Sequence, residues 1–254
     1  MKKISALMGT IGMLFANNLH AAFDGSVTLT QGSYSFSDGG EFTATTSGVG
    51  NLGTFQTFCI ELNETFQPGT AYKYIMNSGA VTGDIGDDAY NQKPVSGPIA
   101  TSGPFNMDNL SIGTAWLYSQ FRANTLASYD FGTTGVHVAA HNQDAGALQD
   151  VFWYLENEIS YSQLTSGFNG ASGALSLTYL NEAIAGTGTT TNTVFNDSNG
   201  KYGVIALNVY DTSGGLHQDQ LAIVPEPTTI FAGALLLLPL GVGVLRILRK
   251  ARAA

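Results

Sequence analysis

The sequence predicts an α+β fold: a β-rich body, sandwich or barrel-like, with a small helical insertion, followed by a C-terminal transmembrane helix. Three observations lead to this prediction. Apolar residues alternate with polar ones early in the chain, recur at helical spacing in the middle, and alternate again after residue 203. Strands followed by helices and then by strands are typical of the α+β class. Residues 230–245 form an uncharged apolar run followed by basic residues, as in a membrane span.

The strands of the first part are predicted from period-two alternation between Gly, Ser and Asp residues. One of them, 54–62, would place Cys59 and Glu61 on the same face. We expect 71–76 to pair with this strand across a Pro-Gly turn. The segment 79–104 is rich in Gly, Pro and Asp, which predicts a long surface loop. The other strands expected in this part are 27–29, 34–36 and 42–46.

The spacing of apolar residues then changes to that of helices. Ile112 and Ala115 belong to a helical pattern whose start is predicted near Asn109 or Ser111. Further helices are expected at 144–158 and 175–185, a loop after Gly135, and strands at 203–210 and 220–224.

The first 22 residues have the three parts of a secretory signal peptide. Lys2 and Lys3 precede an apolar run at 4–15, and the small residues Ala21 and Ala22 follow it. At the other end of the chain, four Lys and Arg residues follow the apolar run, and we expect them to remain in the cytoplasm. The chain between the two ends is therefore predicted to be exported.

The predicted exported domain, residues 23–223, is acidic. All 19 Asp and Glu residues lie within 24–226, together with only four of the 10 Lys and Arg residues. The net charge of −9 argues against nucleic acid as a partner, because phosphate binding needs a basic surface. A single cysteine excludes an intramolecular disulfide and a Cys-rich zinc site.

A short motif stands immediately before the apolar run. Pro225, Glu226 and Pro227 are followed by the run and then by the Arg-rich tail. In this order, residues 224–254 resemble the PEP-CTERM sorting signal. The resemblance implies Gram-negative export and recognition by an exosortase-type enzyme in the inner membrane. It further implies removal of the tail and delivery to the cell surface or the exopolysaccharide matrix. Taken alone, the physical pattern implies an exported domain with a membrane tether.

One cysteine and one glutamine suggest a specific reaction. Cys59 lies between Phe58 and an isoleucine on a predicted strand, and Gln149 has Phe152 and Trp153 one turn ahead of it on a predicted helix. A thiolate held against a side-chain amide can displace ammonia and leave an internal thioester. Fixed geometry lowers the barrier to such an attack, and the site must exclude water to preserve the bond.

Two segments carry a second resemblance. The first is Phe58-Cys59-Ile60 and the second is the apolar-Gln-x-aliphatic-aromatic-Trp pattern of 148–153. They resemble the bacterial thioester domains of Gram-positive surface adhesins, in which the first motif lies on a strand and the second on a later helix. By that resemblance Cys59 supplies the thioester sulfur and Gln149 the acyl group. The resemblance implies covalent capture of an amine.

Three other kinds of site are less well supported. Cys59 with His137 or His141 and an Asp would form a cysteine-hydrolase triad, but such nucleophiles usually occupy a helix start or a strained turn. His137 and His141 are spaced for a metal only if they are helical, and we interpret them as solvated. The segment Asp84–Asp88 lacks the pattern of a calcium loop and is interpreted as an acidic surface loop.

We therefore expect a surface protein for single-use covalent attachment to an amine- or hydroxyl-bearing partner, without enzymatic turnover and without a cofactor. Phe152 and Trp153 would shield the thioester, Phe58 would flank the sulfur, and Glu61 would assist proton transfer. The alternative is a structural or carbohydrate-contacting matrix protein in which Cys59 is an inert buried residue.

Overall fold

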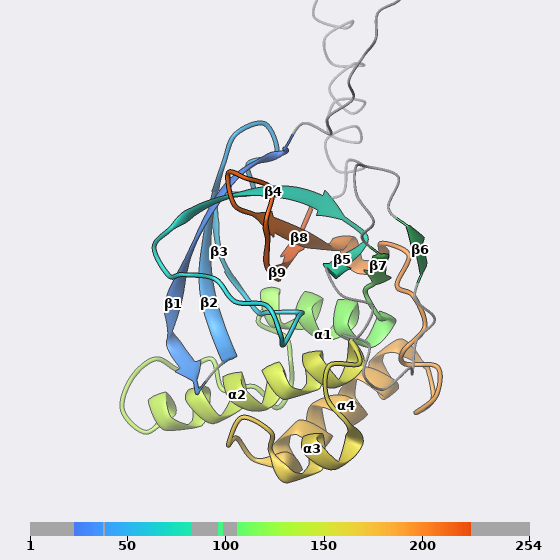
Figure 1. Ribbon diagram of the computed structural model, residues 1–254. Helices are drawn as coiled ribbons and strands as arrows, with labels where there is room; N and C mark the ends of the chain where they lie inside the picture. Colours follow the sequence, from blue (N-terminus) through green and yellow to red (C-terminus); the bar gives the residue numbers. More distant parts are fainter. Residues whose placement is uncertain (1–22, 38, 83–95, 99–105, 225–254) are drawn as a thin grey trace, which may run out of the picture.

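The computed structural model describes residues 23–37, 39–82, 96–98 and 106–224, and it has a β-rich body (Figure 1). Six antiparallel strands form one sheet in the order β3-β2-β1-β4-β8-β9, and three form another in the order β5-β7-β6. This confirms the predicted β-rich body. The strands are β1 (Gly25–Phe36), β2 (Gly39–Ser47), β3 (Thr54–Thr57), β4 (Ala71–Asn77), β5 (Gly79–Thr82), β6 (Ser96–Pro98), β7 (Asn106–Asn109), β8 (Val204–Tyr210) and β9 (Leu216–Ile223).

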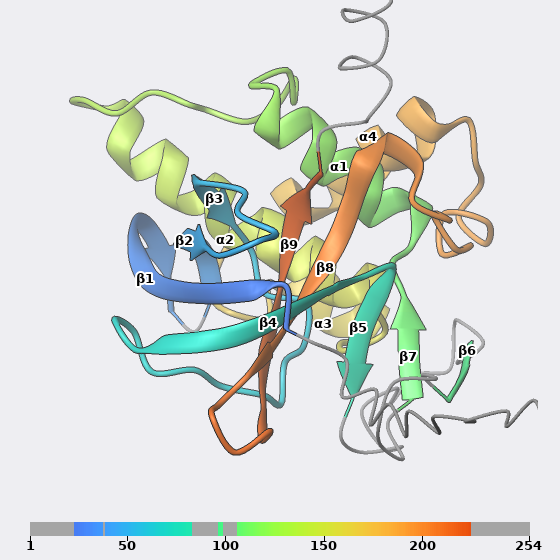
Figure 2. The same ribbon diagram turned by 90° about the horizontal axis from the view of Figure 1, so that it is seen from above.

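The six-stranded sheet closes on itself at one point. Just beyond β3, the Phe58 carbonyl accepts a hydrogen bond from Leu221 N–H at 3.1 Å, and Ile60 N–H donates to the Asp219 carbonyl at 3.0 Å. Between these two bonds Cys59 forms an antiparallel bridge with Gln220 of β9. Figure 2 shows the strands curling round from β3 through β1 and β4 to β8 and β9.

Buried side chains confirm that the sheet encloses an interior. One apolar cluster takes residues from all six strands of the sheet and from no helix. A cluster that takes residues from every strand and from no helix is the interior expected of a sheet that curls round and closes. The fully buried or nearly buried members are Val27, Leu29, Ala44, Phe55, Tyr72, Tyr74, Leu207, Val209 and Ala222.

Four α-helices and then a short 3₁₀ helix (Lys201–Gly203) lie between β7 and β8. Figure 1 shows α2 running across the lower ends of β1 and β2, with α3 and α4 on its other side. The helices have local reasons to begin and end where they do: Ser111 accepts the Thr114 N–H at the start of α1, and Gly188 ends α4 with a left-handed backbone. They are α1 (Ile112–Arg122), α2 (His137–Leu155), α3 (Tyr161–Ser166) and α4 (Gly173–Thr187).

Several boundaries differ from the sequence prediction. The strand expected over 54–62 ends at Thr57, and β4 pairs with β1 and β8 instead of with β3. Long-range pairing with β1, which lies between the two, overrides the local hairpin. The helix expected from Asp144 begins at His137, so the predicted loop after Gly135 is wrong. Strands β5 and β6 lie within the segment expected to be a loop.

The predicted processing signals fall outside the described residues. These are the signal peptide at 1–22 and, beyond Val224, the Pro-Glu-Pro motif, the apolar run and the basic tail. Within the described part of the chain, no helix is both long enough and apolar enough to cross a bilayer.

Candidate functional site

The structure brings Cys59 and Gln149 together. Gln149 lies in the middle of α2, and Cys59 lies just beyond β3 at the point where the sheet closes. The Cys59 N–H donates to Gln149 Oε1 at 3.2 Å, and Gln149 Nε2 donates to the Cys59 carbonyl at 2.8 Å. Both residues are fully buried, at 0% exposure. The 90 positions between them in the sequence are therefore spanned by a direct two-point contact.

The two hydrogen bonds fix the plane of the Gln149 carboxamide on the backbone of the residue that carries the thiol. They also place a backbone N–H on the carboxamide oxygen. Negative charge develops on this oxygen when a nucleophile adds to the carbonyl carbon, and a fixed N–H donor stabilises that charge. The arrangement is suited to acyl chemistry at Gln149, and it equally satisfies two backbone groups that β3 leaves unpaired at Cys59.

The Cys59 thiol is held in its neutral form by its surroundings. Burial raises the pKa of the thiol to about 12, because the thiolate loses hydration. The raising effect is partly opposed by Gln220, whose Nε2 donates to Cys59 Sγ at 3.4 Å. Cys59 is a free cysteine that solvent does not reach.

The aromatic residues expected to shield the pair are buried and pack against other aromatic rings. Phe58 is fully buried and packs edge-on against Phe121, with ring centroids 5.0 Å apart, and against Phe152 at 5.1 Å. Trp153 is 1% exposed, and its ring meets Phe168 edge to face at 6.0 Å. Cys59 and Gln149 are themselves at 0% exposure, and a thioester would require such exclusion from bulk water.

The tip of the β1–β2 hairpin covers the other side of Gln149. A β-carbon on Gly39 would lie 2.5 Å from Gln149 Cγ and 2.9 Å from Trp153 Cη2, so the backbone at Gly39 contacts both side chains. One turn earlier on α2, Gly146 leaves space for the Phe36 ring in the same way. Two glycines therefore allow the hairpin to lie directly on the helix face that carries Gln149.

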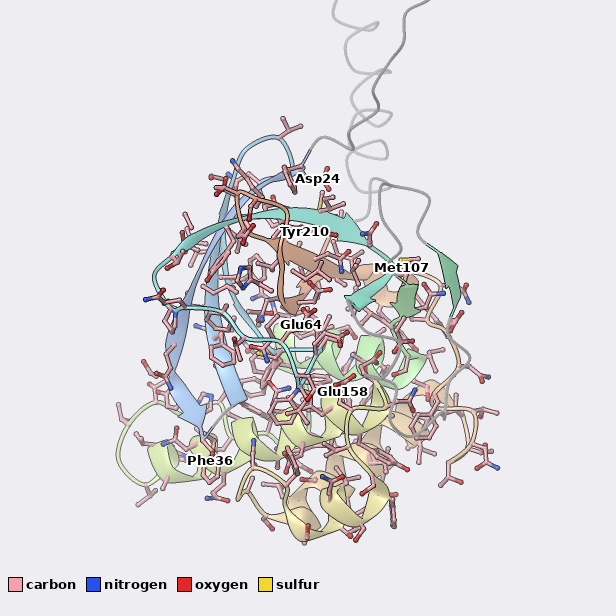
Figure 3. The ribbon with its side chains drawn as sticks, in the orientation of Figure 1. Asp24, Phe36, Glu64, Met107, Glu158 and Tyr210 are labelled. Atoms are coloured by element: carbon pink, nitrogen blue, oxygen red, sulfur yellow. The ribbon has the colours of Figure 1, made fainter. Side chains whose placement is uncertain are left out.

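Glu61 lies among other acids, and its nearest interactions are not with the thiol. The pKa of its carboxyl group is raised well above the usual value by burial and then by the charges of Glu158, Asp219, Glu64 and Asp108. Glu158, at the end of α2, accepts the Leu62 N–H at 3.0 Å. Figure 3 labels Glu64, in the segment after β3, and Glu158, which follows the end of α2.

The two helical histidines bind carboxylates on different elements. His137 Nδ1 lies 2.8 Å from Asp130 Oδ2, and His141 Nε2 lies 2.5 Å from Glu41 Oε1. His141 also stacks on Tyr34, with ring centroids 3.5 Å apart. Across the residues that the structure describes, no three His, Cys, Asp or Glu side chains are grouped to hold a metal ion. Asp84–Asp88 lies outside these residues.

The chain was compared with protein-family models, curated proteins and solved structures. No match was found in any of the three comparisons.

Asp150, next to Gln149, points to a different part of the protein. It is fully buried, and its Oδ1 accepts the Asn169 N–H at 3.3 Å. Burial raises the pKa of this carboxyl group to about 7, although backbone donors at Asn169 and Phe168 oppose the shift. Asp150 therefore fastens the loop after α3 to α2, and its neighbour is free to face Cys59.

Two residues at the site were not predicted from the sequence. Gly39 and Gln220 contact the pair only because the hairpin folds over α2 and β9 closes the sheet. The sequence did contain one relevant signal: Gln218 and Gln220 alternate on a strand that is otherwise apolar after Gln220. Polar residues at this spacing on a buried strand need partners, and Gln220 finds one in the sulfur.

Proposed function

We propose that the domain forms an internal thioester between Cys59 and Gln149 and uses it once, to attach covalently to an amine- or hydroxyl-bearing partner. The observation that carries the proposal is the pair of hydrogen bonds between the Gln149 carboxamide and the Cys59 backbone. It supports the proposal because it fixes the acyl group beside the thiol and supplies a donor to the oxygen that becomes charged.

The reaction that we propose balances without a cofactor. The Cys59 sulfur adds to the Gln149 carbonyl carbon, the C–N bond breaks, and a C–S bond forms. The thiol proton leaves with the amide nitrogen as ammonia. A partner amine or hydroxyl then adds to the same carbon, forms an amide or ester, and releases the thiol of Cys59.

The surroundings favour a bond that persists until a partner arrives. Both residues are fully buried, and Phe58, Phe152 and Trp153, which we propose shield the bond, are buried as well. Water excluded in this way cannot hydrolyse the thioester. The role of Glu61 in proton transfer remains part of the proposal. Burial and the charges of Glu158, Asp219, Glu64 and Asp108 raise the pKa of Glu61 well above its usual value, which favours the protonated form that can donate.

We further propose that the domain is exported and reaches the cell surface or the extracellular matrix. The support lies in the sequence: a signal peptide pattern at 1–22, the motif Pro225-Glu226-Pro227, an apolar run and a basic tail. In this proposal the C-terminal helix anchors the protein in the inner membrane until an exosortase-type enzyme recognises the signal. The acidic domain then remains outside the cell.

A second function is favoured by the same hydrogen bonds. A carboxamide that satisfies an N–H and a carbonyl on one residue also works as a structural strap, here between α2 and the closing point of the sheet. In that case the protein is a structural or carbohydrate-contacting component of the matrix, and Cys59 is an inert buried thiol.

Mass spectrometry of the full chain, purified in detergent, separates the two functions. The thioester predicts a chain lighter by one ammonia than its processed sequence, which gains methylamine on incubation with that amine. Cys59→Ala and Gln149→Ala should abolish both effects. Gln120→Ala should leave both intact, because its carboxamide contacts Ser119 and Thr125 instead. The full calculated mass, with one titratable thiol, would overturn the thioester and support the matrix protein.

A further inference from the structure

Gln220 has hydrogen bonding that a purely structural residue would not need. It is fully buried on β9, and its Nε2 donates to Cys59 Sγ at 3.4 Å and to the Gln218 carbonyl at 3.2 Å. Its Oε1 is buried and has no hydrogen-bond partner among the described residues. A buried amide oxygen without a partner lowers the stability of the fold, so the fold retains Gln220 at a cost.

The orientation of the Gln220 carboxamide is fixed by its neighbours. The Gln218 carbonyl is an acceptor and requires an N–H, so Nε2, and not Oε1, must face it. The same Nε2 then directs an N–H toward the sulfur. The bridge between Cys59 and Gln220 holds the two backbones at a fixed separation, so the contact is built into the closing point of the sheet.

The sulfur needs such a donor most when it is charged. A thiol is a poor nucleophile, and the attack on Gln149 proceeds through the thiolate. Burial opposes ionisation of Cys59, and the N–H of Gln220 is the side-chain hydrogen bond that offsets this opposition. A thiolate is a much stronger hydrogen-bond acceptor than a thioester sulfur. The hydrogen bond from Gln220 is therefore strongest in the reacting thiolate and weaker in the two stable forms, the thiol and the thioester.

We propose that Gln220 stabilises the Cys59 thiolate, both when it attacks Gln149 and when it leaves as a partner amine takes over the acyl group. This inference rests on the proposed thioester and adds a third participant to it. In formation, the S–H bond of Cys59 breaks, a C–S bond replaces the C–N bond of Gln149, and the proton departs with ammonia. In capture, the C–S bond breaks and the thiolate takes up a proton released by the amine.

The test follows the bond in both directions. Incubation with ammonium chloride should convert the thioester back to Gln149 and the free thiol, and removal of ammonia should allow it to form again. The two rate constants are read from the mass of the full chain over time. Gln220→Met keeps the size of the side chain and removes the donor. We expect both rate constants to fall about tenfold, the effect of losing one hydrogen bond to a charged atom.

Gln218→Met is the matched control. Gln218 is a nearly buried glutamine on the same strand, and its Nε2 donates to the Glu61 carbonyl at 2.8 Å, not to the sulfur. This variant should lose thermal stability without slowing either reaction. Gln220→Asn gives a second test if Gln220→Met does not fold, because it keeps a buried amide that is too short to reach the sulfur.

The outcomes distinguish this inference from the thioester itself. If the wild-type chain never loses ammonia, both proposals are overturned. If it does, and Gln220→Met or Gln220→Asn reacts as fast as the wild type, only the role of Gln220 is overturned. The same conclusion follows if Gln218→Met slows the reactions equally, since the effect would then be a general loosening of β9.

Discussion

Gly39 lies so close to Gln149 that a β-carbon at position 39 would stand 2.5 Å from Gln149 Cγ. No side chain larger than hydrogen fits between the hairpin and α2 at this point. The hairpin therefore packs directly on the Gln149 side chain, whose carboxamide bonds to Cys59. Substitution of Gly39 tests whether formation of the proposed thioester depends on the position of the Gln149 carboxamide as well as on its presence.

Gly39→Ala should displace the Gln149 side chain and weaken its two hydrogen bonds to Cys59. Overpacking of this kind costs about 1–3 kcal/mol of unfolding free energy, and we expect the fraction of chain that loses ammonia to fall several-fold. Gly53→Ala is the control, because a β-carbon there meets no atom within 4 Å and the cost is backbone strain at a φ of +77°. Equal thioester yield in the two variants would contradict the steric role of Gly39.

Asp150→Asn should change how stability depends on pH. The pKa of Asp150 is about 7 in the folded protein and 3.8 in its ordinary environment, so the folded state holds a proton that the unfolded chain releases. The contribution of this bound proton to the free energy of unfolding is complete below about pH 4 and is lost as the pH rises to about 7. Asparagine does not titrate, so the variant should be more stable than the wild type at about pH 8, by roughly 1–3 kcal/mol.

Urea denaturation at several pH values measures this difference. Some pH dependence should remain in Asp150→Asn, since burial also raises the pKa of Asp219 to about 7. A variant with the same pH profile as the wild type would show that Asp150 is ionised in the fold.

The Cys59 thiol should be unreactive when no thioester is present. In Gln149→Ala the sulfur is free, but it is buried in the fold and burial raises the pKa of the thiol to about 12. Alkylation by iodoacetamide should therefore proceed only as fast as the protein opens, and addition of urea should accelerate it in step with unfolding. Rapid alkylation of the native protein would mean that the site is open to solvent.

Glu41 should be more important to stability than either of its two buried partners. Its Oε1 accepts a hydrogen bond from the Tyr129 hydroxyl and lies against His141 Nε2, which ties β2 to α2 and to the segment before it. Glu41→Ala should cost roughly 2–4 kcal/mol, because it leaves two buried donors unpaired. Tyr129→Phe removes one donor and should cost about 1 kcal/mol. Denaturant titration of both variants and of the double variant gives the coupling energy, and additive effects would refute the contact.

Local patterns predicted much of the fold. The starts and types of β8, α1 and α4 follow from alternation, from the Ser111 cap and from helical spacing, and these are properties of neighbouring residues. The start of α2 was missed because its first turns carry few apolar residues. They are held instead by the pairing of His141 with Glu41, 100 positions away.

The sequence predicted two residues of the candidate site, Cys59 and Gln149, and missed two others, Gly39 and Gln220. Flanking residues marked Cys59 and Gln149, because apolar neighbours on a strand and a helix repeat a recognisable pattern. The contributions of Gly39 and Gln220 depend on the hairpin folding over α2 and on the closure of the sheet. Neighbouring residues do not reveal which partners these two residues contact, since each contact brings together segments that are more than 100 positions apart.

The closing bridge between Cys59 and Gln220 also has a mechanical consequence. Only residues 221–223 lie between Gln220 and Val224, and the predicted anchor follows Val224 in the sequence. Tension on that anchor would enter the domain along β9, where Leu221 and Ile223 pack against the helical core and Gln220 contacts the Cys59 sulfur. If the proposed thioester forms, a load that pulls β9 away from β8 would alter the position of Gln220 beside the sulfur, and the reactivity of the bond would then depend on that load.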